Sequence, residues 1–227
     1  MNNNISYVQL NIGCLSRNKF WGEPVDAPRR AAVCSSTLLE LADRSFLLVD
    51  PGLPYAAMKE TIYNRRGITP DRISAIFLTH CHGDHMVDLD KYKQCKIYAS
   101  AKEIELNASS FTFTVEPAEA VFNGDGSGGR SWSPNRNVGG NFDGIGAVPL
   151  PGHTMGTTGL AFMSGGLKVL VAGDAVMTKD FFYAGEGYFN TIDEQAAKDS
   201  IYYVRENYDI IIPGHDVQFL SNFHIRR

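Results

Sequence analysis

Four short apolar runs each end at a residue that can bind a metal ion. Residues 73–79 lead into His80, residues 147–152 into His153, residues 167–173 into Asp174 and residues 209–214 into His215. Runs of this length and composition are typical of strands buried in a sheet. Because side chains at the ends of rigid strands are held accurately, the pattern predicts a sheet that carries a metal site at one edge.

The first of these endings is the richest in candidate ligands. It has the sequence Thr79-His80-Cys81-His82-Gly83-Asp84-His85, the pattern H-x-H-x-D-H. His80 and His82 lie two apart in an extended segment, so both can reach the same ion. Gly83 lets the chain turn sharply, so that Asp84 and His85 face a second position a few Å away. The side chain of Cys81 is expected to point away from the ligands and into the core, because alternate residues of an extended segment face opposite ways.

The candidate ligands are too numerous for one closed tetrahedral site. They are five histidines and two aspartates, namely His80, His82, Asp84, His85, His153, Asp174 and His215. Such a set suits two divalent ions with open positions and one bridging aspartate, and open positions indicate catalysis. Zinc is the first expectation, and iron and manganese suit the same nitrogen and oxygen donors. His224 lies outside these motifs and is predicted to be an ordinary core or surface residue.

Composition excludes several other classes of protein. With 227 residues and 44% apolar residues, the chain fits a single domain over residues 1–227 with a sizeable core. The net charge of -4 argues against nucleic-acid binding, and basic pairs such as Arg29-Arg30 and Arg65-Arg66 are predicted to be solvated. No apolar run approaches the roughly 20 residues that span a membrane, and no secretory signal is expected. The four cysteines form no disulfide framework. A cytoplasmic protein with a small-molecule substrate is expected, and a homodimer is compatible with these numbers.

The remaining local patterns predict further elements. Residues 5–10, 33–41 and 45–49 are expected to be strands, and residues 55–66 a helix that ends at Gly67. The spacing of Thr191 and Glu194 predicts a capping box that opens a helix running to about Asn207. The segment 109–141 is rich in glycine with interspersed aromatic residues, and two interpretations stay open for it. It is either a long surface loop with a partly buried aromatic cluster or a flap over a pocket.

Taken together, the motifs resemble those of the metallo-β-lactamase-fold superfamily. The resemblance runs from Asp50-Pro51-Gly52 through H-x-H-x-D-H, Pro151-Gly152-His153 and Gly173-Asp174 to Pro213-Gly214-His215. It implies an α/β (α+β) fold, the αββα sandwich, in which two mixed β-sheets are flanked by helices. It also implies that His80, His82 and His153 hold metal 1, that Asp84, His85 and His215 hold metal 2, and that Asp174 bridges them. Asp50 would orient the histidine-bearing loop.

Within this superfamily the chain is most similar to the N-acyl-homoserine lactonases. Asp174-Ala-Val-Met-Thr-Lys179 resembles the lactonase stretch D-A-x-Y-T-K, and Ile211-Ile-Pro-Gly-His215-Asp216 is similar too. A true β-lactamase usually has cysteine at the position of Asp174. The chain departs from the lactonases at Met177, where they place a tyrosine that hydrogen-bonds the substrate, and whether Tyr183 compensates stays open. This departure puts lactone specificity in doubt.

The function expected first is metal-dependent hydrolysis of a small ester-like substrate, with a lactone as the first candidate. A bridging hydroxide would attack the carbonyl carbon, and Asp84 would take a proton from it and return the proton to the leaving group. Asp84 and Asp174 are therefore the expected catalytic residues. At most two of five nearby aromatic residues are expected to line a substrate pocket, the five being Phe181, Phe182, Tyr183, Tyr188 and Phe189.

Two alternatives remain open at this stage. A mononuclear iron persulfide (sulfur) dioxygenase of the same fold also carries H-x-H-x-D-H, but it needs only two histidines and one carboxylate on its iron. A non-catalytic metal-binding protein would not need all seven ligands. Metal content and turnover distinguish both from a dinuclear hydrolase.

Overall fold

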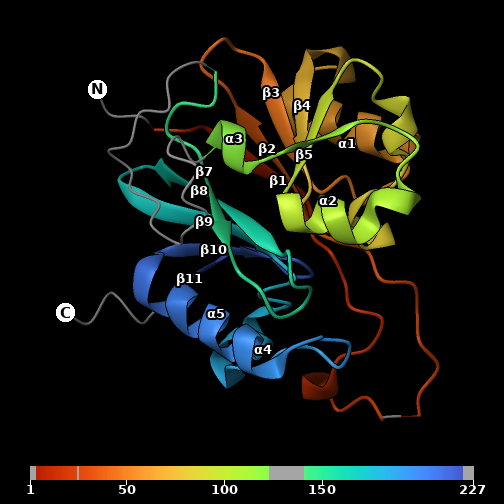
Figure 1. The fold of residues 1–227 in the computed structure, drawn as a ribbon, viewed down its shortest axis with the longest axis vertical. Helices are drawn as coiled ribbons and strands as arrows, with labels where there is room; N and C mark the ends of the chain where they lie inside the picture. The colour runs from red at the N-terminus through yellow and green to blue at the C-terminus, as the bar shows by residue number, and fades with distance from the viewer. Residues whose placement is uncertain (1–3, 25, 123–140, 222–227) are drawn as a thin grey trace.

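Two β-sheets lie face to face, and helices cover the outer face of each sheet (Figure 1). The structure is a computed structural model, and it describes residues 4–24, 26–122 and 141–221. The predicted αββα sandwich of two mixed sheets is confirmed. That residues 1–227 form one domain stays a prediction.

The first sheet has six strands in the order β1-β2-β3-β4-β5-β6. The pairs β1–β2 and β2–β3 are antiparallel, and the pairs from β3 to β6 are parallel. The strands are β1 (Tyr7–Asn11), β2 (Ser36–Glu40), β3 (Phe46–Val49), β4 (Ile73–Phe77), β5 (Lys96–Ala99) and β6 (Val115–Pro117).

The second sheet has five strands in the order β11-β10-β9-β8-β7. Only the pair β9–β10 is parallel among them. The strands are β7 (Gly146–Pro149), β8 (Thr158–Ser164), β9 (Leu167–Gly173), β10 (Ile210–Pro213) and β11 (Phe219–Leu220).

Helices pack on the outer faces of both sheets, and Figure 1 shows α4 and α5 beneath the second sheet. The helices are α1 (Tyr55–Arg66), α2 (Ala101–Asn107), α3 (Glu119–Phe122), α4 (Lys179–Ala184) and α5 (Glu194–Asn207). Within the described ranges, no helix is both long and apolar enough to cross a membrane.

The alternation of side chains along the strands separates the core into layers. In β2, Leu38 packs in the cluster under α1, whereas Leu39 packs in the cluster between the two sheets. In β9, Leu170 packs with Ile201 of α5, whereas Val169 packs between the sheets. Because both faces of each sheet are covered, the central strands are apolar on both sides, and this explains the continuous apolar runs in the sequence.

The predicted strands and helices are present, some with different bounds, but the predicted capping box is not. Helix α1 has the predicted bounds, and Gly67 ends it in the left-handed conformation with a φ of 70°. The predicted capping box at Thr191 and Glu194 is wrong, because the Asp193 carboxylate accepts the hydrogen bond from the Ala196 N–H and α5 begins at Glu194. The strand expected over residues 33–41 is regular only as β2, and the strands near residues 5–10 and 45–49 are β1 and β3.

The segment 109–141 is only partly irregular. Its first part forms β6, which pairs with β5 at the edge of the first sheet, and α3, whose Phe122 packs between the sheets. Phe111 and Phe113 are partly buried and pack against the core cluster on the outer face of the first sheet, as the interpretation with a partly buried aromatic cluster predicted. The rest of the predicted flap, residues 123–140, lies outside the described residues, and so does His224.

Candidate metal centre

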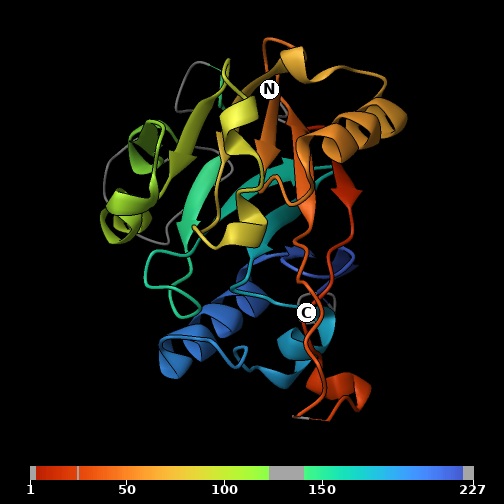
Figure 2. The ribbon, with the colours of Figure 1, turned by 90° about the vertical axis from the view of Figure 1, so that its right-hand side faces the viewer.

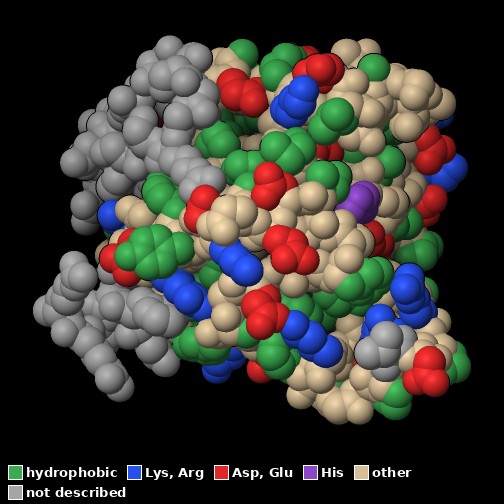
Figure 3. Space-filling model, turned by 60° about the horizontal axis from the view of Figure 1, so that its bottom comes forward, with side chains coloured by type: hydrophobic (Ala, Val, Ile, Leu, Met, Phe, Trp, Pro, Cys, Tyr) green, Lys and Arg blue, Asp and Glu red, His purple; other side chains and the backbone are tan. Residues whose placement is uncertain are grey.

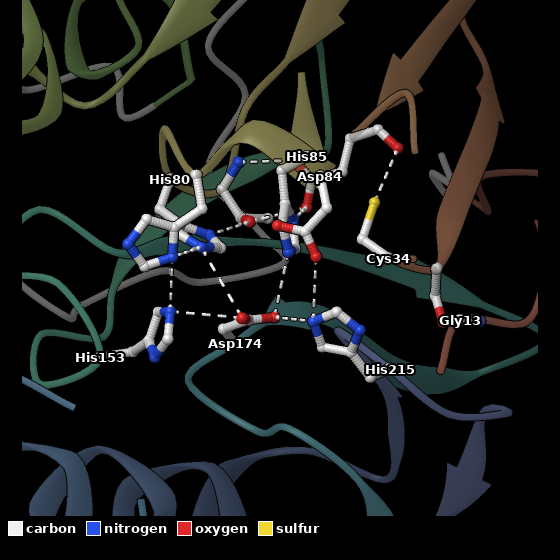
Figure 4. Close-up of polar contacts among 12 residues, drawn as sticks. Gly13, Cys34, His80, Asp84, His85, His153, Asp174 and His215 are labelled. Carbon is white, nitrogen blue, oxygen red and sulfur yellow. Dashed lines mark hydrogen bonds and ion pairs between the residues drawn. The ribbon is translucent and has the colours of Figure 1, made fainter. Parts of the chain in front are cut away.

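The four strand endings converge at one edge of the sandwich. His80 follows β4 of the first sheet, whereas His153, Asp174 and His215 follow β7, β9 and β10 of the second sheet. The side chains point toward one another between the sheets (Figure 4). All seven predicted ligands lie in two groups able to hold a metal ion, namely His80, His82, His153 and Asp174 in one and Asp84, His85 and His215 in the other.

In the first group, three imidazole nitrogens face a common point. His82 Nδ1 lies 3.0 Å from His80 Nε2 and 2.9 Å from His153 Nε2. His80 and His153 are buried, and His82 is partly exposed. Nitrogen atoms gathered this closely on one side suit a single ion that takes all three lone pairs.

The second group lies on the other side of Asp174. His215 Nε2 is 3.6 Å from Asp84 Oδ2, and the Asp84 side chain keeps 25% of its surface exposed, whereas the His215 side chain keeps 2%. His85 is buried and comes from the short 3₁₀ turn Gly83–His85, so the turn at Gly83 does carry Asp84 and His85 to this side. Asp84 is therefore the carboxylate of the two groups that is more exposed to solvent.

Asp174 lies between the two groups and presents one oxygen to each. Its Oδ2 is 3.3 Å from His153 Nε2 and 3.7 Å from His80 Nε2. Its Oδ1 is 3.2 Å from both His85 Nε2 and His215 Nε2. The Asp174 carboxylate can lie here only because residue 214 is a glycine, since a Cβ at Gly214 would lie 2.0 Å from Asp174 Oδ1.

The donors fit bound cations. His85 Nε2 and Asp174 Oδ1 are buried and lack a hydrogen-bond partner, which is costly unless something else satisfies them. Burial lowers the pKa of His80 well below its usual value and that of His153 to about 4, so both imidazoles are neutral as metal ligands must be. Burial alone would raise the pKa of Asp174, but His215, His85 and His153 hold it well below its usual value, so the carboxylate is ionised.

Asp50 orients the histidine-bearing loop, as the superfamily resemblance implied. Its Oδ2 lies 2.9 Å from His85 Nδ1, which leaves His85 Nε2 to face Asp174. Its Oδ1 accepts from the Thr79 N–H at 2.8 Å, and its Oδ2 accepts from the Thr79 hydroxyl at 2.7 Å. Such hydrogen bonds fix the tautomer and the direction of a histidine ligand.

His215 is oriented by backbone carbonyls that the sequence analysis did not find. Its Nδ1 donates toward the Val33 oxygen at 2.9 Å and lies 3.2 Å from the Cys14 oxygen. Cys14 and Val33 pair with each other in an isolated antiparallel bridge within the segment that connects β1 to β2. Because any residue type presents a carbonyl, no sequence signal could have pointed to them.

Glu103 is the other functional group that the sequence analysis missed. This buried residue of α2 accepts from the Cys81 N–H through Oε2 at 2.9 Å and from the Thr154 hydroxyl through Oε1. It therefore ties the loop of His80 and His82 to the loop of His153. The Cys81 side chain is buried in the core, as predicted, and Glu103 raises the pKa of its thiol in addition to the larger effect of burial.

Replacing Glu103 by alanine is expected to lower the free energy of unfolding by about 1–3 kcal/mol, because the buried Cys81 N–H loses its acceptor. Urea denaturation measures this loss. Glu105→Ala, which removes an exposed carboxylate on the same helix, is the matched control and should change the stability by less than about 0.5 kcal/mol. Equal losses in the free energy of unfolding in the two variants would show that the hydrogen bonds of Glu103 do not stabilise the fold.

Gly173 is required where β9 reaches Asp174. It has a φ of 52°, and a Cβ there would lie 2.3 Å from the Thr79 hydroxyl oxygen that donates to Asp50. Gly173→Ala is therefore expected to cost about 2–4 kcal/mol of stability. Gly67→Ala is the control, since Gly67 has a φ of 70° but open space around it, and should cost only about 1 kcal/mol. Urea denaturation of both variants checks the difference, and similar losses would contradict it.

The aromatic residues expected near a pocket divide into two sets. Phe182 is buried under α5, and Tyr183 packs on Phe182 and Phe219. Phe181, Tyr188 and Phe189 line a hollow, and how many of the five residues line a substrate pocket stays a prediction. Met177 is buried with Leu15, Phe181 and Tyr188, so the position of the lactonase tyrosine is filled by an apolar side chain.

Comparison with known proteins gives the family. The family model described as the metallo-beta-lactamase superfamily matches residues 29–215. The chain belongs to the metallo-β-lactamase superfamily. This membership makes the protein a metallo-hydrolase, the enzyme class that its sequence predicted. No curated protein matches the chain.

Solved structures share the fold of this superfamily member. A mutant of the Bacillus thuringiensis protein AiiA with N-decanoyl-L-homoserine bound is 19% identical, with a TM-score of 0.62 over 96% of this chain and 95% of that one. A probable metal-dependent hydrolase from Staphylococcus aureus is 14% identical, with a TM-score of 0.66 over 99% of this chain and 95% of that one. A quorum-quenching N-acyl homoserine lactone hydrolase is 20% identical, with a TM-score of 0.63 over 96% and 94%.

Proposed function

We propose that this protein is a dinuclear metal-dependent hydrolase that cleaves a small ester-like substrate. The position of Asp174 carries the proposal, because its two oxygens each face two histidine nitrogens from different groups. A carboxylate in this position suits a bridge between two ions. A closed structural site for a single ion would not require all seven residues of the two groups.

In this proposal His80, His82 and His153 hold the first ion, and Asp84, His85 and His215 hold the second. Zinc is the first candidate, with iron or manganese as alternatives. When bound, two divalent ions supply a hydroxide that is nucleophilic at neutral pH and polarise the bond to be cleaved. Asp50 and the Val33 carbonyl keep His85 and His215 in the orientation that this binding requires.

Asp84 is the proposed proton carrier of the reaction. Its side chain is the exposed carboxylate of the cluster and lies beside His215. It therefore is placed to accept a proton from the attacking water and to return it to the leaving alkoxide. Both oxygens of Asp174 are directed at histidines, so Asp174 is less free to accept and return a proton.

A lactone is the first substrate candidate. The similar solved structures include proteins named as N-acyl homoserine lactone hydrolases, and the stretch from Asp174 to Lys179 resembles theirs. Met177 stands against a purely lactonase-like pocket, because it has no hydroxyl to donate to a carbonyl. Open-chain esters therefore belong in the same panel. A cytoplasmic location and a homodimer stay predictions from the sequence.

The test is hydrolysis of a panel of lactones and activated esters by protein loaded with zinc. The proposal expects turnover that a chelator abolishes and that added zinc restores. Oxygen uptake with glutathione persulfide, in protein that holds one iron, would instead establish the dioxygenase. No turnover of any substrate by fully loaded protein would favour a non-catalytic metal-binding protein.

A further inference from the structure

Two consecutive serines lie where the chain enters β2, beside the second group of candidate ligands. Ser35 is 3% exposed and Ser36 is fully buried. Figure 4 shows the adjoining Cys34 on the same side of Asp174 as His215. Because successive side chains of an extended segment point to opposite faces, the two hydroxyls hold different parts of the site.

Ser36 holds the backbone on both sides of the turn that follows Asp50. Its hydroxyl donates to the Asp50 oxygen at 2.6 Å and accepts from the Gly52 N–H at 3.0 Å. Asp50 has a φ of 51°, a left-handed conformation that is strained for a residue with a Cβ. The Asp50 carboxylate orients His85 through its Nδ1. The Ser36 hydroxyl therefore fixes the backbone from which the partner of His85 projects.

Ser35 holds the backbone on both sides of His215. Its N–H donates to the Gly214 oxygen at 2.6 Å, and its hydroxyl donates to the Asp216 oxygen at 3.0 Å. The same hydroxyl accepts from the Gly13 N–H at 2.9 Å. A Cβ at Gly13 would lie 2.6 Å from the Ser35 nitrogen, so the two segments approach this closely only because residue 13 is a glycine. With the peptides on both sides tied to Ser35, the backbone of His215 is fixed in place.

The segment of residues 33–36 thus contacts the second group and not the first. Its Val33 carbonyl accepts from His215 Nδ1, and its two serines hold the backbones of His215 and Asp50. Among the described residues, no hydrogen bond joins this segment to a histidine of the first group. Removing a serine hydroxyl should therefore act mainly on the ion that His85 and His215 hold.

Both serines are too deeply buried to contact a substrate. Figure 3 shows a histidine side chain at the surface of the molecule, whereas Ser35 and Ser36 lie beneath it. Figure 2 shows the two arms of the segment between β1 and β2 running side by side down the molecule, and Cys14 pairs with Val33 across them. The serines therefore act through the segments that they hold.

We infer that Ser35 and Ser36 are positioning residues of the second metal position and set how tightly its ion is held. The inference rests on the proposed dinuclear function. Ser36 acts on His85 through Asp50, and Ser35 acts on His215 through the peptides on either side of it. Groups that orient metal ligands typically contribute about 10–100-fold to metal affinity.

Competition with a chromophoric chelator measures the two zinc affinities without turnover. Ser35→Ala and Ser36→Ala, measured separately, should each weaken one of the two zinc ions by about 10–100-fold and leave the other nearly unchanged. Thr37→Val is the matched control, because the Thr37 hydroxyl is buried in the same strand and makes no hydrogen bond among the described residues. It should change neither affinity. Circular dichroism identifies the temperatures at which each variant is folded, and a merely structural role would lower the melting temperature without changing either affinity there.

Proton NMR of the zinc-loaded variants assigns each effect to its histidine. The Nδ1 protons of His85 and His215 lie in buried hydrogen bonds to the Asp50 carboxylate and the Val33 carbonyl, so slowly exchanging signals at low field are expected for both. Ser36→Ala should shift the His85 signal, and Ser35→Ala should shift the His215 signal. Thr37→Val should shift neither.

The outcomes separate this inference from the proposed function. Two zinc affinities that stay parental in both serine variants would overturn the inference and leave the dinuclear site standing. Equal losses of zinc affinity in Thr37→Val would overturn it as well. A parent that binds a single zinc ion, with an affinity that falls in the serine variants, would sink the dinuclear hydrolase and support the role of the serines.

Discussion

Replacing Asp174 by asparagine is expected to lower kcat/KM on every cleaved ester by on the order of 10³-fold and to reduce the bound metal from about two ions per chain to one or fewer. The physical reason is the loss of one of the two negative oxygens that face His80 and His153 on one side and His85 and His215 on the other. An amide has one oxygen acceptor and an NH₂ group that cannot bind a cation.

The comparison needs a variant with the same change at the surface. Asp71→Asn alters an exposed aspartate before β4, and it should leave both metal content and kcat/KM unchanged. Elemental analysis and ester hydrolysis on both variants complete the test. An Asp174→Asn protein with full metal content and parental activity would show that this carboxylate does not bridge.

Removal of metal is expected to lower the melting temperature by roughly 8–16 °C. An ion present at about 1,000 times its dissociation constant stabilises the folded state by about 4 kcal/mol, and in a chain of this size each kcal/mol shifts the melting temperature by about 2–4 °C. The expected cause is local, because without cations the buried His85 Nε2 and Asp174 Oδ1 make no hydrogen bond.

Thermal melting followed by circular dichroism, before and after dialysis against a chelator, measures this effect. Added zinc should restore the original melting temperature. Asp174→Asn should show a smaller shift than the parent, because it holds less metal at the start. A melting temperature that does not change after elemental analysis has shown the metal to be gone would contradict the stabilising role.

Much of the site was predictable because its residues stand at the ends of strands. Each of His80, His153, Asp174 and His215 follows an apolar run, and the fold brings the ends of these runs to one edge. The turn at Gly83 and the inward side chain of Cys81 followed from the same local geometry. Periodicity and motif spacing carry this kind of information.

The parts that escaped prediction depend on contacts between distant segments. Glu103 binds the Cys81 N–H across 22 residues, and the Val33 carbonyl reaches His215 across 182 residues. Neither a lone glutamate in a helix nor a carbonyl has a pattern that marks it. The start of α5 was misplaced because Thr191 and Asp193 are both good caps, and only the folded geometry selects Asp193.

The number of metal ions per chain tests the central claim most directly. Elemental mass spectrometry should be applied to protein expressed separately with added zinc and with added iron, together with hydrolysis assays on the same samples. The dinuclear hydrolase predicts about two ions per chain and hydrolysis that rises with occupancy. One tightly held iron per chain in both media, without hydrolysis, would contradict it.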